Sequence, residues 1–303
     1  MAVVDFRPSK GTLAWWVWVY LWGPVALLIG FGPLLLANFF QFATLVVYPF
    51  SKPLFRQWNR WISYAVWNVW WASNLRRFIG FRTEAIGDKI PPGETAIVVA
   101  NHQSMTDTMV MLCFAEDHKL TNDIKFMAKN ELRYVPVFGW AIVFADFVML
   151  RRDWAKDEAK ITATFARFQK TADPFWLLMF PEGTRLTAQK QQDSRDRAVS
   201  KGFEPMTQVL WPRPKGFTAA LKGLRGKVDA IYSIAIDYPG RPPKLYQFIR
   251  GDVTRVAIHI KRHPIATLPQ GDSELADWLV GEFRWMDQKL EAGVSQLTDP
   301  AQF

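Results

Sequence analysis

The chain has 303 residues, half of them hydrophobic, and a net charge of +9. This length and apolar content are enough for one large hydrophobic core or two modest ones. The single cysteine, Cys113, excludes an internal disulfide, and we interpret it as a core residue of a protein from a reducing compartment.

The basic excess belongs to the amino-terminal quarter of the chain. Residues 6–83 contain eight Lys and Arg and no acidic residue, whereas the rest of the chain from Glu84 balances 29 Lys and Arg against 27 Asp and Glu. The positive charge therefore accompanies an apolar segment rather than a folded domain. This distribution argues against nucleic-acid binding and favours a membrane surface.

The apolar segment is long enough to reach into a bilayer. Residues 11–51 contain no charged side chain and no histidine, and as continuous helix they would extend about 60 Å, twice the roughly 30 Å of a hydrocarbon core. Residues 30–33 (GFGP) form a natural break. We therefore predict helices at 12–29 and 34–50 that make a hydrophobic hairpin, a membrane anchor with both ends on the cytoplasmic side. The arms are short for transmembrane helices, so the hairpin either spans the bilayer or enters one leaflet; a cleaved signal peptide is disfavoured because the stretch is too long.

The next segment, 54–77, has the pattern of an amphipathic helix. Apolar residues recur at helical spacing from Leu54 to Val69, while Arg56 and Arg60 lie off that stripe, and nine of the fifteen tryptophans precede position 72. The stripe either packs on the rest of the protein or contacts lipid, and the tryptophans favour lipid. We assign residues 1–77 to a membrane-associated hairpin with a Trp-rich helix, and residues 78–303 to a second domain.

From residue 78 onward, short apolar runs alternate with helix-like stretches. Strands are predicted at 78–85, 95–100, 124–128, 147–150, 175–180, 228–236 and 253–260. Helices are predicted at 105–116, 136–144, 154–171, 189–203, 217–225 and 273–292. This alternation predicts an α/β domain with a mostly parallel layered sheet flanked by helices.

Residues 101–107 (NHQSMTD) follow the predicted strand 95–100 and place a histidine at the edge of the sheet. Residues five apart on one helix point to different sides, so His102 and Asp107 can meet only across a turn. Ser104 as helix N-cap and Asp107 at the third helical position would provide that turn. The carboxylate would then orient the imidazole as a general base. The alternative is that Asp107 only completes a capping box and His102 is only a hydrogen-bonded residue at a strand end.

A second polar segment, residues 180–185 (FPEGTR), follows the strand predicted at 175–180. The carboxyl ends of two parallel strands lie at one edge of a sheet, where open α/β folds bind ligands. Arg185 is suited to bind a phosphate in bidentate fashion, and Glu182 to accept a hydroxyl proton or to aim the arginine. The alternative is a turn with a local ion pair between Glu182 and Arg185. The four histidines show no convincing metal-ligand spacing, and no G-x-S-x-G elbow is present.

Together, NHQSMTD and FPEGTR resemble the first and third sequence blocks of the glycerolipid acyltransferases, which include the 1-acyl-sn-glycerol-3-phosphate acyltransferases. Residues 137–151 are similar to the second block and end in its arginine, Arg151, but Leu150 stands where the family has an aspartate. Residues 150–152 and 210–216 resemble the branch of lysocardiolipin acyltransferase-like proteins. The resemblance covers residues 78–240.

The resemblance implies a set of site residues and co-substrates. The catalytic residues would be His102 and Asp107, and the substrate-binding residues Glu182, Gly183, Thr184, Arg185, Arg151, Arg152 and Lys215. It implies no metal and no cofactor, acyl-CoA or acyl-carrier protein as the acyl donor, a lysophospholipid as the acceptor, and a bilayer as the partner. The expected location is a membrane such as the bacterial inner membrane, with the catalytic domain in the cytoplasm.

The expected activity is that of a membrane-bound O-acyltransferase which acylates the free hydroxyl of 1-acyl-glycerol-3-phosphate and so produces phosphatidic acid. Because no activated nucleophile is present, direct transfer is expected rather than an acyl-enzyme. Three alternatives stay open: an acyltransferase for another lysophospholipid, a lipid hydrolase in which His102 activates water, and a catalytically inactive membrane scaffold.

Overall fold

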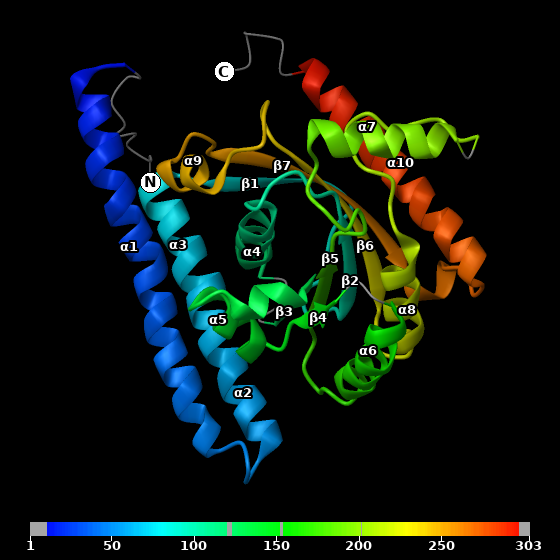
Figure 1. Cartoon of the computed structure of the whole chain (residues 1–303), viewed down its shortest axis with the longest axis horizontal. Coiled ribbons are helices and arrows are strands. Elements are labelled where there is room, and N and C mark those ends of the chain that lie inside the picture. Colours follow the sequence, from blue (N-terminus) through cyan, green and yellow to red (C-terminus); the bar gives the residue numbers. More distant parts are fainter. Residues whose placement is uncertain (1–10, 120–122, 152–153, 201, 297–303) are drawn as a thin grey trace.

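The protein is built around one seven-stranded sheet (Figure 1). A computed structural model of the chain describes residues 11–119, 123–151, 154–200 and 202–296. The strands are β1 (Arg82–Gly87), β2 (Ala96–Ala100), β3 (Ile124–Lys129), β4 (Val148–Leu150), β5 (Trp176–Met179), β6 (Ala230–Asp237) and β7 (Arg255–Pro264). They lie in the order β1-β7-β6-β2-β5-β3-β4, and neighbours run parallel except β6 and β7. The predicted mostly parallel α/β fold is therefore confirmed.

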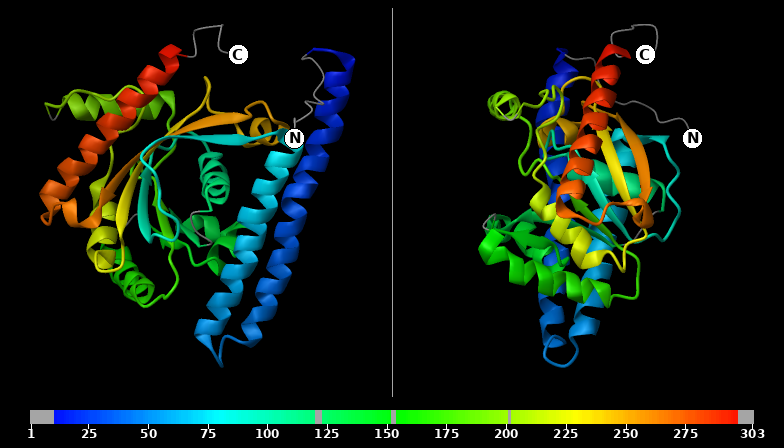
Figure 2. Two further views of the ribbon diagram at one scale, coloured as in Figure 1. Left: turned by 180° about the vertical axis from the view of Figure 1, so that it is seen from behind. Right: turned by 90° about the vertical axis from the view of Figure 1, so that its right-hand side faces the viewer.

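The central strands are buried on both faces, because helices cover both sides of the sheet (Figure 2). Every residue of β2 and β5 is buried, which explains why these strands are continuous apolar runs rather than alternating ones. Residues of β2 that point to one face, such as Val98, belong to one core cluster, and their neighbours, such as Ile97, belong to another. The sheet thus separates two hydrophobic cores.

Each core is closed by its own set of helices. On one face lie α4 (Asp107–Asp117), α5 (Phe138–Phe144), α9 (Leu245–Arg250) and the amino-terminal helices. On the other lie α6 (Trp154–Gln169), α8 (Pro214–Leu224) and α10 (Asp272–Gln296). A further helix, α7 (Ala188–Val199), lies against the carboxyl-terminal half of the chain (Figure 1).

All seven predicted strands correspond to observed ones, with ends that differ by a few residues. The largest shift is at β1, which begins at Arg82 rather than at 78. The preceding residues still belong to the helical segment, which ends at Gly80 with a left-handed φ of 72°. Helix α9 was not predicted, because six residues are too few to display helical periodicity.

The amino-terminal region forms a helical hairpin, but its turn is not where the sequence predicted it. Helix α1 runs without interruption over Leu13–Ala43 and contains both Pro24 and Pro33, so the predicted break at 30–33 is wrong. A proline removes one backbone hydrogen bond, and a helix supported by packing can tolerate that loss. Here α1 packs along α2, α5 and α9.

The actual turn lies between Ala43 and Lys52. It contains the 3-10 segment Thr44–Val46 and ends at Ser51, whose hydroxyl accepts a hydrogen bond from the Leu54 N–H and so caps the returning helix. The return arm comprises α2 (Lys52–Ser63), a π-helical segment (Tyr64–Trp71), α3 (Ala72–Asn74) and a second π-helical segment (Leu75–Ile79). In the part of the chain that the structure describes, no helix has both the length and the hydropathy of a membrane span.

The hairpin is polar inside and apolar outside. Between its arms, the Asn59 amide donates to Thr44 Oγ1 at 2.7 Å and the Gln41 amide donates to Ser63 Oγ at 3.3 Å. Large apolar side chains are exposed along α1, at the turn and on α2: Leu35, Leu36, Phe39, Phe40, Tyr48, Phe50, Trp58 and Trp61. The predicted apolar stripe from Leu54 to Val69 lies largely on this outer surface.

Candidate active site

The two polar segments that follow β2 and β5 lie side by side, as the sequence predicted. These strands are hydrogen-bonded neighbours and run parallel, so their carboxyl ends meet at one edge of the sheet. The Leu186 N–H donates to the His102 carbonyl at 2.8 Å, which joins the two segments directly. His102 lines a cavity of about 1590 Å³ that opens at this edge.

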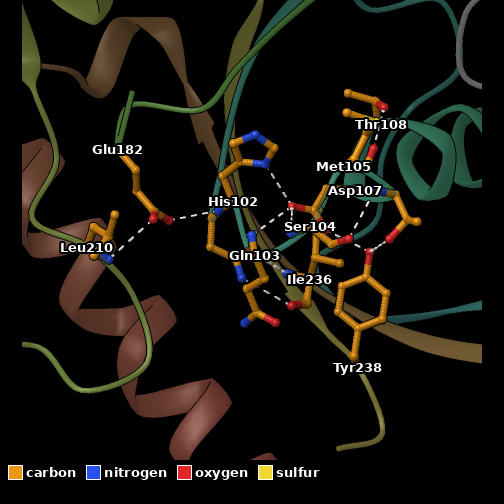
Figure 3. Close-up of polar contacts among 12 residues, drawn as sticks. His102, Gln103, Ser104, Met105, Asp107, Thr108, Glu182, Leu210, Ile236 and Tyr238 are labelled. Carbon is orange, nitrogen blue, oxygen red and sulfur yellow. Dashed lines mark hydrogen bonds and ion pairs between the residues drawn. The ribbon is translucent and has the colours of Figure 1, made fainter. Parts of the chain in front are cut away.

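His102 and Asp107 are in contact across a turn (Figure 3). The distance from His102 Nδ1 to Asp107 Oδ2 is 2.8 Å, and the same oxygen accepts the backbone N–H groups of Gln103 at 2.7 Å and Ser104 at 2.9 Å. Asp107 therefore supplies the carboxylate half of the predicted capping box. The Ser104 hydroxyl does not complete it, because it donates to the Pro243 carbonyl and accepts from the Thr106 N–H.

A tyrosine that the sequence analysis did not identify completes the environment of Asp107. Tyr238 lies just after β6, and its hydroxyl donates to Asp107 Oδ1 at 2.7 Å while lying 2.9 Å from Thr106 Oγ1. Burial and the neighbouring Asp107 raise the pKa of the Tyr238 phenol well above its ordinary value, so the phenol stays a hydrogen-bond donor. Both carboxylate oxygens of Asp107 are thus bound, and the side chain is fully buried.

The imidazole of His102 is fixed by a second contact. Its ring stacks on Phe180, with centroids 4.1 Å apart and planes inclined by 16°. Because Nδ1 is directed at Asp107, Nε2 is the ring nitrogen that remains for a molecule in the cavity. The pair has the geometry of an oriented general base.

Glu182 does not have either of the contacts predicted from the sequence. Its side chain is buried, with 2% of its surface exposed, and accepts hydrogen bonds from the backbone N–H groups of His102 at 2.8 Å and Leu210 at 3.3 Å. Burial raises the pKa of Glu182 well above the usual range, although the two N–H groups oppose the shift. The carboxyl group therefore fixes the segment after β5 to the backbone of His102, rather than facing a substrate hydroxyl or pairing with Arg185.

The residues that follow Glu182 face the cavity. Gly183 has a left-handed φ of 70°, and a Cβ atom there would lie 3.4 Å from the Arg213 side chain. Thr184 accepts a hydrogen bond from Lys190 Nζ at 2.5 Å, and Arg185 is exposed and lines the cavity. Arg213, which the sequence analysis missed, lines it as well, and its N–H donates to the Pro181 carbonyl at 2.8 Å.

The remaining predicted phosphate ligands do not all reach the site. Lys215, in the first turn of α8, lines the cavity. Arg151 does not, because the Asp157 carboxylate binds its backbone N–H at 2.7 Å at the start of α6 and the side chain is exposed elsewhere. Arg152 lies outside the described residues. The predicted arginine pair is therefore not part of the site that the structure describes.

The cavity has two chemically different ends. Toward the hairpin and α4 it is apolar, and its lining there includes Leu34, Trp67, Trp71, Met109, Leu112 and Phe138. At the edge near the segment after β5 its lining is rich in cations: Lys129, Arg185, Lys190, Arg197, Arg213, Lys215 and Arg284. Cys113 is a buried core residue, as predicted, and burial raises its thiol pKa, so it does not provide a reactive thiolate.

Comparison with known proteins places these features in a family. Residues 82–232 match the family model described as Acyltransferase, and residues 247–292 match the one described as Acyltransferase C-terminus. The chain is 32% identical over 278 residues to 1-acyl-sn-glycerol-3-phosphate acyltransferase 2 of Arabidopsis thaliana, covering 88% of this chain and 70% of that protein.

Two further relatives are similar over most of the chain. It is 32% identical over 265 residues to 1-acyl-sn-glycerol-3-phosphate acyltransferase gamma of Mus musculus, covering 84% and 70% of the two chains. The crystal structure of the 1-acyl-sn-glycerophosphate acyltransferase from Thermotoga maritima matches with a TM-score of 0.47 at 19% identity, covering 89% of this chain and 97% of that one.

The contacts of Glu182 lead to a prediction about stability. In either protonation state the two carboxyl oxygens can accept both N–H groups, whereas the amide of Glu182→Gln offers one acceptor and turns its NH₂ toward the other donor. We expect this substitution to lower the free energy of unfolding by about 1–3 kcal/mol, the cost of a buried unsatisfied donor, as measured by denaturant unfolding in detergent.

Glu158→Gln, on the exposed face of α6, is the matched control and is expected to change the free energy of unfolding by less than about 0.5 kcal/mol. Equal stability of the Glu182→Gln and wild-type proteins would show that the two N–H groups do not depend on this carboxyl group.

Proposed function

The chain belongs to the 1-acyl-sn-glycerol-3-phosphate acyltransferase family of enzymes, and from this premise we propose that it transfers a fatty acyl group from an acyl thioester to the free hydroxyl of a lysophospholipid. The observation that carries the proposal is the His102–Asp107 pair at a cavity with one apolar and one cationic end. An acceptor with a lipid tail and an anionic headgroup has the same two-part character.

We propose that His102 is the general base. As the acceptor oxygen attacks the thioester carbonyl carbon, its proton moves to His102 Nε2. When the C–S bond breaks, the same proton is available to the departing thiolate, so the histidine is regenerated and no acyl-enzyme is formed. Asp107 keeps the imidazole in the required tautomer and stabilises the imidazolium, and Tyr238 restrains the carboxylate.

We propose that Arg185, with Arg213 and Lys215, binds the acceptor phosphate. All three line the cavity, and a guanidinium group is suited to bind two oxygens of a phosphate monoester at once. The names of the relatives in Arabidopsis thaliana and Mus musculus include 1-acyl-sn-glycerol-3-phosphate. That molecule is therefore the acceptor we propose, and phosphatidic acid is the product.

The acyl chains would occupy the apolar end of the cavity. Its lining comes from α1, the return arm of the hairpin, α4 and α5. At about 1590 Å³ the cavity is larger than the roughly 300–1,000 Å³ of a typical small-molecule pocket, which leaves room for lipid tails beside the reacting groups.

We propose that the hairpin enters one leaflet of a membrane and that the catalytic domain lies on the cytoplasmic side. The support is the inverted polarity of the hairpin, which has hydrogen-bonded polar side chains between its arms and exposed aromatic and aliphatic side chains outside. In water this arrangement exposes a large apolar surface, whereas in lipid it buries that surface and keeps the polar groups paired.

The first test of catalysis is His102→Ala. Without a general base, acyl transfer is expected to fall by about 10²-fold or more, while the circular dichroism spectrum stays that of the wild type. The assay uses purified protein in detergent, a labelled acyl donor, a panel of lysophospholipids and product identification by mass.

His118→Ala, at the exposed end of α4, is the control and should retain activity. Near-normal transfer by His102→Ala would end the proposal. Release of free fatty acid by the wild type without any acceptor would identify a hydrolase instead.

The second test separates the two substrates. Arg185→Ala should raise the KM for 1-acylglycerol-3-phosphate by about tenfold, the loss of one charge-assisted contact, and leave the KM for the acyl donor unchanged. A monoacylglycerol without phosphate should be acylated equally poorly by both proteins.

Arg255→Ala, an exposed position on β7, serves as the control for loss of a positive charge. An equal rise in both KM values would contradict the assignment of Arg185 to the acceptor phosphate.

The third test concerns the hairpin. The double substitution Trp58→Asp and Trp61→Asp places charge on the outer face of α2 and should reduce cosedimentation with phosphatidylethanolamine and phosphatidylglycerol vesicles severalfold, because carboxylates disfavour insertion. Val199→Asp, an exposed apolar position at the end of α7, should not. Unchanged vesicle binding of the double variant would exclude this face as the membrane contact.

A further inference from the structure

The lining of the cavity has more positive charge than one acceptor phosphate requires. Apart from Arg185, Arg213 and Lys215, the cations at this end include Lys190, Arg197 and Arg284, and the acidic residue nearest to them in the lining is Asp277. A single phosphate monoester is satisfied by two or three cationic side chains. The additional cations point to a second anionic ligand.

These additional cations belong to a distinct lobe of the cavity, which we call the α7–α10 lobe. It is lined by Arg197 of α7, Phe203 and Trp211 of the connecting segment, and Val280 and Arg284 of α10. The Trp211 and Phe203 rings are 5.0 Å apart, and the Arg284 guanidinium lies 5.9 Å from the Trp211 ring. Aromatic faces next to arginines combine what a nucleotide base and its phosphates need.

The lobe is part of a well-ordered frame rather than a loose surface. Asp287 of α10 accepts the backbone N–H groups of Thr207, Gln208 and Val209, which fixes the connecting segment to α10. Next along the chain, Leu210 donates its N–H to Glu182, the carboxyl group that also holds His102. Trp211 therefore follows directly on the residue that joins the lobe to the site.

We propose that the α7–α10 lobe binds the nucleotide end of a coenzyme A thioester, which makes coenzyme A rather than a carrier protein the carrier of the acyl group. Arg197 and Arg284 bind its phosphates, and the adenine stacks on Trp211. This assignment rests on the proposed acyl transfer from a thioester. The pantetheine arm then leads past Gly183 and Arg213 toward His102.

The charges in the lobe can be rearranged for such a ligand. Arg284 lies 3.8 Å from Glu204, whose side chain is 93% exposed. A pair of this kind contributes little in water, so a phosphate can replace the glutamate as the partner of Arg284. Arg197 is exposed on α7. A carrier protein would instead contact an outer surface, and the aromatic rings inside the lobe would have no role.

The test is the double variant Arg197→Ala and Arg284→Ala, with Lys289→Ala on the exposed face of α10 as the matched control. In the double variant the KM for acyl-CoA should rise by about tenfold or more, while the KM for 1-acylglycerol-3-phosphate stays the same. Acyl-pantetheine, which lacks the nucleotide, should be used equally by variant, control and wild type, a result that a general structural defect would not give.

A second measurement does not depend on acyl transfer. Adenosine 3′,5′-bisphosphate should bind the wild type and Lys289→Ala equally in isothermal titration calorimetry, and at least about tenfold more weakly to the double variant. If this difference is found but no lysophospholipid is acylated, the nucleotide lobe stands and the proposed function fails. An unchanged KM for acyl-CoA, an equal loss with acyl-pantetheine, or a rise in KM confined to acyl-carrier protein would overturn the assignment of the lobe.

Discussion

A carboxylate buried without a cationic partner needs hydrogen-bond donors on both oxygens, and the active-site edge is organised around the way Asp107 meets this need. Two backbone N–H groups, the His102 ring and the Tyr238 hydroxyl all point at it. The donors come from the turn before α4 and from the end of β6, so the requirement of one side chain fixes the positions of two chain segments. The orientation of His102 follows from this arrangement, because the imidazole is one of the donors.

Glu182 applies the same principle to the opposite side of His102. Its carboxyl group joins the backbone of His102 to that of Leu210, and thus connects the ends of β2 and β5 to the segment that leads to α8. Two acidic side chains therefore hold one histidine, Asp107 through the ring and Glu182 through the main chain. Neither needs to contact a substrate to be required for activity, and in this framework Arg185 and Arg213 are the exposed groups.

The sequence was most informative where one local pattern determined the structure. The buried strands were predictable because parallel strands covered on both faces are continuous apolar runs, and the contact between His102 and Asp107 followed from the need for a turn between them. Tyr238 was not predictable, because it lies 131 positions from Asp107 and nothing local marks it as a donor. For Glu182, the residue type was informative but its partners are backbone N–H groups that only the fold brings near. In α1, Pro33 was interpreted as a helix end, since packing along a 31-residue helix cannot be judged from the proline itself.

The hairpin and the cavity can be understood together. Residues of α1 and of the return arm, including Leu34, Trp67 and Trp71, line the apolar end of the same cavity whose other end contains His102 and the cations. If the outer face of the hairpin lies in lipid, its inner face forms a wall between the bilayer and the catalytic edge. A lysophospholipid could then present its headgroup to the arginines while its tail stays in apolar surroundings throughout, so the transfer of a long hydrocarbon chain into water is avoided. The inverted polarity of the hairpin and the two-ended chemistry of the cavity would then serve the same requirement, the handling of a molecule that is half lipid and half ion.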